Sequence, residues 1–284
     1  MNKQEFDYII IGGGSSGCVL AGRLSENPQV SVCLLEAGGA GEGWKVEVPC
    51  AAVISIPTKI NNWAFETVPQ KGLNGRKGYQ PRGKCLGGSS AINAMVYIRG
   101  HRQDYDDWAA LGNTGWSYDE VLPYFIKSEN NQRIKNQYHG NAGPLSVIDL
   151  RSDNPLQQKY IAAAKEQGYR ILDDFNGEEQ EGLGIYQVTH INGERCSSAR
   201  AYLFPHRDRK NLTVETHAQT QRILIENGVA VGVEYKQGGQ LKQIFARREV
   251  LLSAGAMQSP QILMLSGVGD QQELAQHGIE VKQH

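Results

Sequence analysis

The apolar residues near the start of the chain follow a strand, helix, strand order. A short run from Tyr8 to Ile11 has the length and β-branched content of a buried strand, and it stops at three glycines. Apolar residues then recur at helical spacing from Cys18 to Leu24. A second buried-type run, Val30 to Leu35, ends on Glu36. The pattern predicts an α/β unit at the beginning of the chain.

The same reasoning predicts elements further along. Apolar residues at helical spacing predict an amphipathic helix from Asn154 to Gly168. Asn227-Gly228 predicts a tight hairpin turn between two strands. The predicted strands are Gly182 to Ile191, Leu212 to Val214, Ile223 to Glu226, Val229 to Tyr235 and Glu249 to Ser253.

Gly12, Gly14 and Gly17 form a G-x-G-x-x-G turn between the first strand and the first helix. In such a turn the first glycine allows the sharp bend, the second leaves room for a pyrophosphate, and the third lets the helix pack closely. The helix N-terminus attracts the anion through its N–H groups and its dipole. Glu36 follows Gly17 by nineteen positions, about where an acidic residue accepts the ribose hydroxyls. A carboxylate repels a 2′-phosphate, which favours FAD or NAD over NADP.

The letters Gly13-x-Ser15-x-Gly17 also match a serine-hydrolase nucleophile elbow, which likewise lies between a strand and a helix. An elbow normally follows several strands and an oxyanion loop, and here only eleven residues precede Gly12. Glu36 has no role in that interpretation. The hydrolase therefore stands as the second class of function.

Composition narrows the class of protein further. The 284 residues include 40% hydrophobic residues, 29 basic and 30 acidic side chains and a net charge of −1, with no basic run. Nucleic acid is therefore not an expected partner. No apolar stretch approaches a membrane span and no leader is evident, so we expect a cytoplasmic protein and leave peripheral contact with the inner membrane open. Five widely spaced cysteines match neither a zinc site nor a disulfide framework, and we expect no metal.

A second glycine-rich stretch runs from Pro81 to Gly100. On its own it is more typical of a turn before a helix than of a ligand cradle. However, the segment from Gly83 to Asn93, with the later stretch from Gly255 to Gly269, resembles the two signatures of the glucose–methanol–choline (GMC) flavoprotein oxidoreductases. Asn62-Trp63 is also similar to that family. The resemblance covers the whole chain and is greatest to the branch of choline-dehydrogenase-like bacterial alcohol dehydrogenases.

The resemblance implies an α/β fold with a Rossmann-like FAD-binding domain and a partial, interleaved substrate domain containing α+β elements. Its boundaries would be 1–153 for the first part of the FAD-binding domain, 154–200 for the partial substrate-domain insertion, and 201–284 for the continued FAD-binding domain. Some members attach FAD through a histidine where this chain has Ile92, so we expect non-covalent FAD. The cofactor-binding residues it implies are Gly12, Gly14, Ser15, Ser16, Gly17, Glu36, Ala37, Arg82, Gly83, Leu86, Gly87, Gly88, Ser89, Asn93, Ala94, Met95, Val96, Thr220, Ala254 and Gly255.

The family oxidises alcohols with a histidine base on a segment well beyond the second signature, and this chain ends fifteen residues past Gly269. We therefore expect no catalytic residue here, and the C-terminal part of the family fold to be absent. The implied activity is oxidation of a primary alcohol, choline-like, aliphatic or aromatic, with a quinone, oxygen or carrier as acceptor. Alternatives are an FAD-binding module without independent catalysis and a partnership with a complementary C-terminal chain. All seven histidines are expected in loops or at the surface: His101, His139, His190, His206, His217, His277 and His284.

Overall fold

The computed structural model describes residues 3–284 and separates into two compact units. The first unit runs up to Asn93 and resumes at Ser197, and the second spans Ala94–Cys196. The second compact unit thus begins at Ala94, well before residue 154, where the substrate-domain insertion was predicted to start. Which function each segment serves stays a prediction.

A six-stranded sheet forms the centre of the first unit, in the order β13-β2-β1-β16-β15-β14. Four neighbours, β13, β2, β1 and β16, run parallel, whereas β15 is antiparallel to both strands beside it. The strands are β1 Glu5–Ile11, β2 Val32–Leu35, β13 Leu212–Glu215, β14 Gln219–Glu226, β15 Val229–Gln237 and β16 Gln240–Leu252. The mixed α/β architecture and its parallel sheet confirm the predicted fold class.

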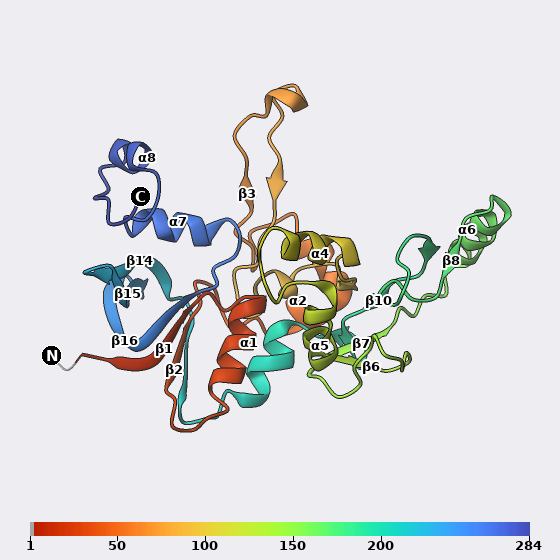
Figure 1. Cartoon of the computed structure of the whole chain (residues 1–284), viewed down its shortest axis with the longest axis horizontal. Helices are drawn as coiled ribbons and strands as arrows, with labels where there is room; N and C mark the ends of the chain where they lie inside the picture. The colour runs from red at the N-terminus through yellow and green to blue at the C-terminus, as the bar shows by residue number, and fades with distance from the viewer. Residues whose placement is uncertain (1–2) are drawn as a thin grey trace. The chain divides into compact units, whose positions relative to one another are not determined.

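The side chains of β1 and β2 are buried on both faces of the sheet, which is why these strands are almost entirely apolar. All four residues of β2 are buried, and Ile9 and Ile10 of β1 have no exposed surface. Helix α1, Ser15–Leu24, packs against β1 and β2, as Figure 1 shows, and buries Cys18. Cys33 on β2 is buried as well, so both thiols are the small core residues that their positions indicate.

The hairpin between β14 and β15 confirms the turn signal. Asn227 and Gly228 have φ values of 50° and 79°, the positive angles that a type I′ turn requires. The last strand, β16, begins nine residues before the predicted Glu249. Its first half pairs with β15 and its second half pairs with β1, so this strand connects the antiparallel and the parallel parts of the sheet. Its polar first half gave no buried-strand pattern.

The remaining elements of the first unit surround the sheet. Strands β3 and β4 form a hairpin that extends away from the sheet, seen in orange in Figure 1. The elements are α2 Trp44–Glu47, η1 Pro49–Ala51, α3 Ala52–Ser55, β3 Phe65–Glu66, η2 Lys71–Leu73, β4 Tyr79–Gln80, η3 Gly88–Ala91, the π-helix η4 Ala199–Leu203, η5 Phe204–His206, α7 Gln258–Leu265 and α8 Gln271–Gln276.

The second unit contains a four-stranded sheet, β5-β10-β7-β6, and three helices. The predicted amphipathic helix is confirmed as α6, Pro155–Glu166, where the Asn154 side chain accepts a hydrogen bond from the Leu156 N–H at 3.0 Å. Its elements are β5 Val96–Tyr97, α4 Arg102–Ala110, α5 Tyr118–Ser128, β6 Glu129–Asn131, β7 Leu145–Asp149, α6, β8 Ile171–Leu172, β9 Leu183–Gly184, β10 Gln187–Val188, β11 His190–Ile191 and β12 Glu194–Arg195.

The single strand predicted from Gly182 to Ile191 is wrong. That segment forms three two-residue strands, β9, β10 and β11, which pair in three different sheets. A Cβ on Gly184 would lie 2.2 Å from the Leu172 carbonyl oxygen, so the glycine here serves a close backbone approach. Within residues 3–284, none of the helices combines the length and the apolar character that a membrane crossing requires.

Candidate functional site

The first glycine turn lies where β1 meets α1, and two of its glycines are required by close packing. Gly12 has φ +95°, and a Cβ there would lie 2.7 Å from the Ser253 carbonyl oxygen. A Cβ on Gly17 would lie 1.9 Å from the Gly12 carbonyl oxygen. The N–H of Gly12 donates to the Leu35 carbonyl at 2.8 Å. The turn is therefore held in one conformation by its neighbours in the sheet.

Glu36 is a buried carboxylate at the end of β2, with 6% of its surface exposed. One carboxylate oxygen accepts the Gly13 N–H at 2.9 Å and the other accepts the Gly38 N–H at 2.7 Å. Burial raises the pKa of Glu36, while the two backbone N–H donors and the charges of Lys84 and His217 act in the opposite direction. Each oxygen retains acceptor capacity beyond its one backbone bond.

The second glycine-rich loop folds onto the first turn through its backbone. The Gly87 N–H donates to the Gly13 carbonyl at 2.7 Å, and the Leu86 N–H donates to the Gly39 carbonyl at 2.9 Å. A Cβ on Gly88 would lie 2.7 Å from the Gly14 Cα. Segments about seventy residues apart in the sequence are thus packed backbone to backbone.

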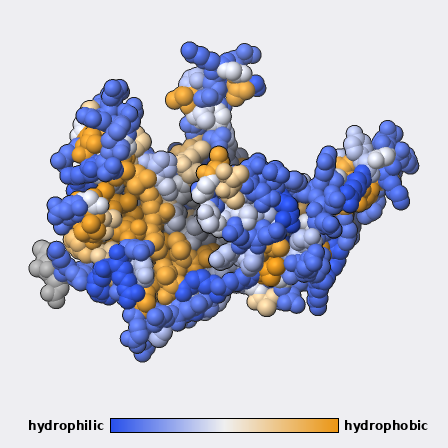
Figure 2. All heavy atoms as spheres, in the orientation of Figure 1, coloured by the Kyte–Doolittle hydropathy of each residue, from blue (hydrophilic) through white to orange (hydrophobic). Residues whose placement is uncertain are grey.

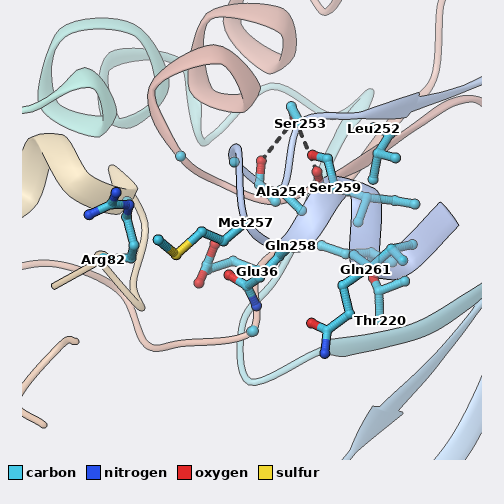
Figure 3. A pocket seen from close by; sticks show the side chains of 18 of the residues that line it. Glu36, Arg82, Thr220, Leu252, Ser253, Ala254, Met257, Gln258, Ser259 and Gln261 are labelled. Atoms are coloured by element: carbon cyan, nitrogen blue, oxygen red, sulfur yellow. Dashed lines mark hydrogen bonds between the residues drawn. The ribbon is translucent and has the colours of Figure 1, made fainter. Parts of the chain in front are cut away.

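A cavity of about 680 Å³ opens beside these two loops and the start of α7. Figure 3 shows the side chains of Glu36, Arg82, Thr220 and Met257 around it. Thirteen of the predicted cofactor-binding residues line the cavity: Gly12, Gly14, Ser15, Ser16, Glu36, Ala37, Arg82, Gly83, Gly88, Ser89, Thr220, Ala254 and Gly255.

Other predicted residues do not line the cavity. Gly17, Leu86 and Gly87 support it from behind, since they pack against or hydrogen-bond to the turn at Gly12 and Gly13. Asn93 is not among the lining residues either. Ala94, Met95 and Val96 belong to the second unit, and their role stays a prediction.

The cavity also has lining residues that the sequence argument did not select. Trp63 stacks on Phe65 with ring centroids 5.6 Å apart, and the Lys84 ammonium lies 4.0 Å from the Trp63 ring centroid. The family-like Asn62-Trp63 pair was the available signal for Trp63, and the second signature was the signal for the lining residues from Ala256 onward. The lining residues not selected are Ile11, Leu20, Leu35, Trp63, Ala218, Gln219, Gln221, Leu252, Ser253, Ala256, Met257, Gln258, Ser259, Gln261, Ile262 and Leu265.

Gly14 tests whether this cavity fits a pyrophosphate. It lines the cavity, and the nearest atom to a Cβ built there is the Gly88 Cα at 4.0 Å. Its φ of −79° is open to any residue, so neither protein packing nor backbone angle demands glycine. A pyrophosphate that approaches the main chain closely would favour glycine at this position, as an N-cap position also does. The first-turn N–H groups of α1 lack partners within the helix, and the positive end of its dipole favours an anion there.

Comparison with known proteins identifies the family of this chain. The family model for GMC oxidoreductases matches residues 6–282. The chain belongs to the GMC oxidoreductase family. GMC members among the curated relatives include "Alcohol dehydrogenase [acceptor]" of Pseudomonas putida, 48% identical over 96% of this chain and 50% of that protein. Human mitochondrial choline dehydrogenase is 44% identical over 100% of this chain and 49% of that protein.

A solved structure agrees with the assignment. Aspergillus oryzae formate oxidase, determined to study its FAD modification, is 30% identical with a TM-score of 0.91 and covers 99% of this chain and 51% of that one. The chain spans about half the length of the curated relatives it matches. Family and structural neighbours together imply FAD as the cofactor. The serine-hydrolase interpretation is not supported by these relatives.

A second polar cluster lies inside the second unit, around His139. This histidine lies in a loop, as expected, but its side chain has no exposed surface. Its Nδ1 is 2.9 Å from a Glu129 carboxylate oxygen and its Nε2 is 2.9 Å from an Asp174 oxygen. Arg99 donates to the other Glu129 oxygen at 2.9 Å. Spacing gave no signal for this cluster, because its members come from separate segments.

Proposed function

We propose that the protein carrying this chain oxidises a primary alcohol, choline-like, aliphatic or aromatic, to the aldehyde with FAD. The observation that carries the proposal is Gly14, which lines the cavity with the nearest atom to a Cβ there at 4.0 Å, beside the buried acceptor Glu36. In this proposal the N-terminus of α1 binds the pyrophosphate and Glu36 accepts the adenosine ribose hydroxyls. Thr220, Arg82 and the Gly83–Ser89 loop would hold other parts of the cofactor. Bound FAD would supply the hydride acceptor.

We propose further that the FAD is bound without a covalent link. Ile92 is 3% exposed and carries no nucleophile that could attach to a flavin. Acid precipitation of the yellow protein is expected to release all flavin into the supernatant. Flavin that remains with the denatured pellet would contradict the non-covalent assignment.

The activity is tested on the complete protein by anaerobic addition of choline, a long-chain alcohol and an aromatic alcohol. Loss of the oxidised flavin absorbance with one of them is the expected result. Glu36→Ala should weaken FAD binding, whereas an Ala substitution at the exposed Glu226, which is not a lining residue, should not. Full FAD binding in Glu36→Ala would refute the ribose assignment, and an unreduced flavin with all three alcohols would refute the substrate class.

A second candidate is an FAD-binding module without catalysis of its own. The observation that favours it is that none of the described residues lining the cavity is a histidine, so no side chain of the usual general base is present there. In that case the isolated chain turns yellow with FAD but is not bleached by alcohol. We also propose a complementary C-terminal chain as a possible partner and a quinone, oxygen or a carrier as the electron acceptor. We propose a cytoplasmic location, with peripheral contact to the inner membrane as an alternative.

A further inference from the structure

Lys84 does not line the cavity, but its backbone joins two segments that do. Its N–H donates to the Asn61 carbonyl at 2.7 Å, two residues before Trp63. Its carbonyl oxygen lies 1.8 Å from the position of a Cβ on Gly38, the residue whose N–H donates to Glu36. The backbone at Lys84 therefore connects the segment of Trp63 with the segment of Glu36.

The Trp63 side chain lines the cavity, and three contacts orient it. Its backbone N–H donates to the Arg82 carbonyl at 2.8 Å, and its ring stacks on Phe65 with an interplanar angle of 8°. The Lys84 ammonium lies 4.0 Å from the Trp63 ring centroid, which is a cation–π contact. No carboxylate oxygen of residues 3–284 lies within ion-pair distance of this ammonium, so its charge is not neutralised by a partner there.

The charge of Lys84 also acts on Glu36. Burial raises the pKa of Glu36, the two backbone N–H donors oppose this change, and the charges of Lys84 and His217 oppose it further. Burial and the charge of Glu36 raise the pKa of the Cys18 thiol to about 12, so this neighbour is uncharged. Lys84 and His217 are thus the two cations that favour the carboxylate.

The surroundings of these groups are apolar enough for a single charge to matter. Side chains such as Ile11, Leu252 and Ile262 line the cavity. Figure 2 shows a largely apolar face between α7 and the sheet of the first unit. Because an apolar wall screens a charge less than bulk water does, an ammonium there influences groups that it does not touch.

We infer that Lys84 is a positioning residue of the cofactor site. Its charge holds the Trp63 ring at the cavity wall and favours the carboxylate of Glu36, so one side chain outside the cavity prepares two groups inside it for FAD. Lys84 acts through these two residues and needs no contact with the cofactor itself. The inference rests on the proposed binding of FAD and adds a supporting residue to that site.

A direct attraction between Lys84 and the pyrophosphate would give a different pH profile. The pyrophosphate diester keeps its charge on mild acidification, so loss of the attraction would weaken binding equally at every pH. Through Glu36, by contrast, removal of the Lys84 charge raises the pKa of the carboxyl group. The loss of FAD affinity on acidification then occurs at a higher pH.

The test measures the FAD affinity of the complete protein against pH by fluorescence titration. Lys84→Met and Lys84→Gln remove the charge, and Lys84→Arg keeps one. The matched control is Lys45→Met, because the Lys45 ammonium also lies over a tryptophan, 5.9 Å from the Trp44 ring centroid, and neither residue lines the cavity. All forms carry His217→Asn, which removes the other cation that acts on Glu36 and suits the positive φ of 54° at that position.

The neutral forms should differ from the parent in two ways. They should bind FAD at least about tenfold more weakly, and their affinity should fall at a higher pH on acidification. Lys84→Arg should recover most of both properties, and Lys45→Met should match the parent. Adding Glu36→Gln should remove the shift in the pH profile but leave the loss that acts through Trp63. Circular dichroism of each form establishes that it is folded.

Two results would overturn the inference and leave the proposed function intact. One is FAD binding in both neutral forms that matches the parent at every pH. The other is a uniform loss of affinity with an unchanged pH profile, which would assign Lys84 to direct attraction of the pyrophosphate. A wild-type protein that binds no FAD would refute the cofactor assignment and this inference together. FAD that binds but is not bleached by alcohol would refute only the proposed reaction.

Discussion

Two glycines of the first turn should respond in opposite ways to the same substitution. Gly17→Ala places a Cβ 1.9 Å from the Gly12 carbonyl oxygen and 3.0 Å from Ser253 Oγ. Gly14→Ala places a Cβ no closer than 4.0 Å to any atom beyond its adjacent residues, the nearest being the Gly88 Cα. Gly17→Ala should therefore lower the stability of the fold, whereas Gly14→Ala should lower the affinity for the ligand.

The magnitudes follow from these contacts. Overlap of more than 1 Å with a backbone atom requires α1 and β1 to separate, and overpacking of this kind costs about 3 kcal/mol even after alanine's gain in helix propensity. In a domain of this size that lowers Tm by roughly 6–12 °C. Gly14 is the N-cap of α1, where alanine is less favourable than glycine by at most about 1 kcal/mol.

The assay pairs thermal unfolding with FAD titration. Gly14→Ala should unfold within a few degrees of wild type in the absence of FAD, yet bind FAD at least about a hundredfold more weakly, a loss of about 2.7 kcal/mol. Gly17→Ala should lose its stability whether or not FAD is added. If Gly14→Ala binds FAD like the wild type, or unfolds as early as Gly17→Ala, the assignment of the cavity to the pyrophosphate is refuted.

Three further outcomes are expected. Because burial raises the pKa of Glu36, FAD affinity should fall on acidification at a higher pH than an exposed carboxylate would give, and Glu36→Gln should remove that pH dependence in a fluorescence titration. Burial lowers the pKa of His139, but hydrogen bonds to Asp174 and Glu129 outweigh it and raise the pKa to about 9. The folded-state value is therefore above the unfolded one, so about 3 kcal/mol of stability present below pH ~6.5 should disappear as pH rises through 9, and urea titrations of His139→Gln should lack this change. Cys50 is exposed, whereas burial raises the pKa of the Cys18 thiol to about 12, so a thiol reagent should modify Cys50 in the folded protein and Cys18 only after unfolding; fast modification of Cys18 would contradict the packing of α1.

The sequence was most informative where local backbone preferences within a few residues determine the structure. The strand at Tyr8–Ile11, the glycine turn and the acidic residue Glu36 all follow from local rules on backbone angles, anion binding and spacing. Asn227-Gly228 is a similar case, because a two-residue turn with positive φ angles needs no distant partner. At these positions local preference and the final fold agree.

The rest required contacts between distant segments. The backbone bond from Gly87 to Gly13 and the cluster of His139 with Glu129 and Asp174 depend on tertiary packing that no spacing rule encodes. The interrupted segment from Gly182 to Ile191 pairs in three different sheets, which an apolar run cannot show. Sequence therefore indicated many of the residues that line the cavity but not how the loops support them.

The glycines around the cavity form two groups, according to whether another part of the backbone lies close to the position of a Cβ. A Cβ on Gly38 would lie 1.8 Å from the Lys84 carbonyl oxygen, and one on Gly83 would lie 2.0 Å from the Gly88 oxygen, so the chain itself excludes larger residues there. Gly14 has no such neighbour. The first group joins the two loops in close backbone contact, and Gly14 is a position on the cavity wall where no such contact is made. A site of this kind loses little entropy on binding, which is why one added methyl group at Gly14 should cost affinity without costing the fold.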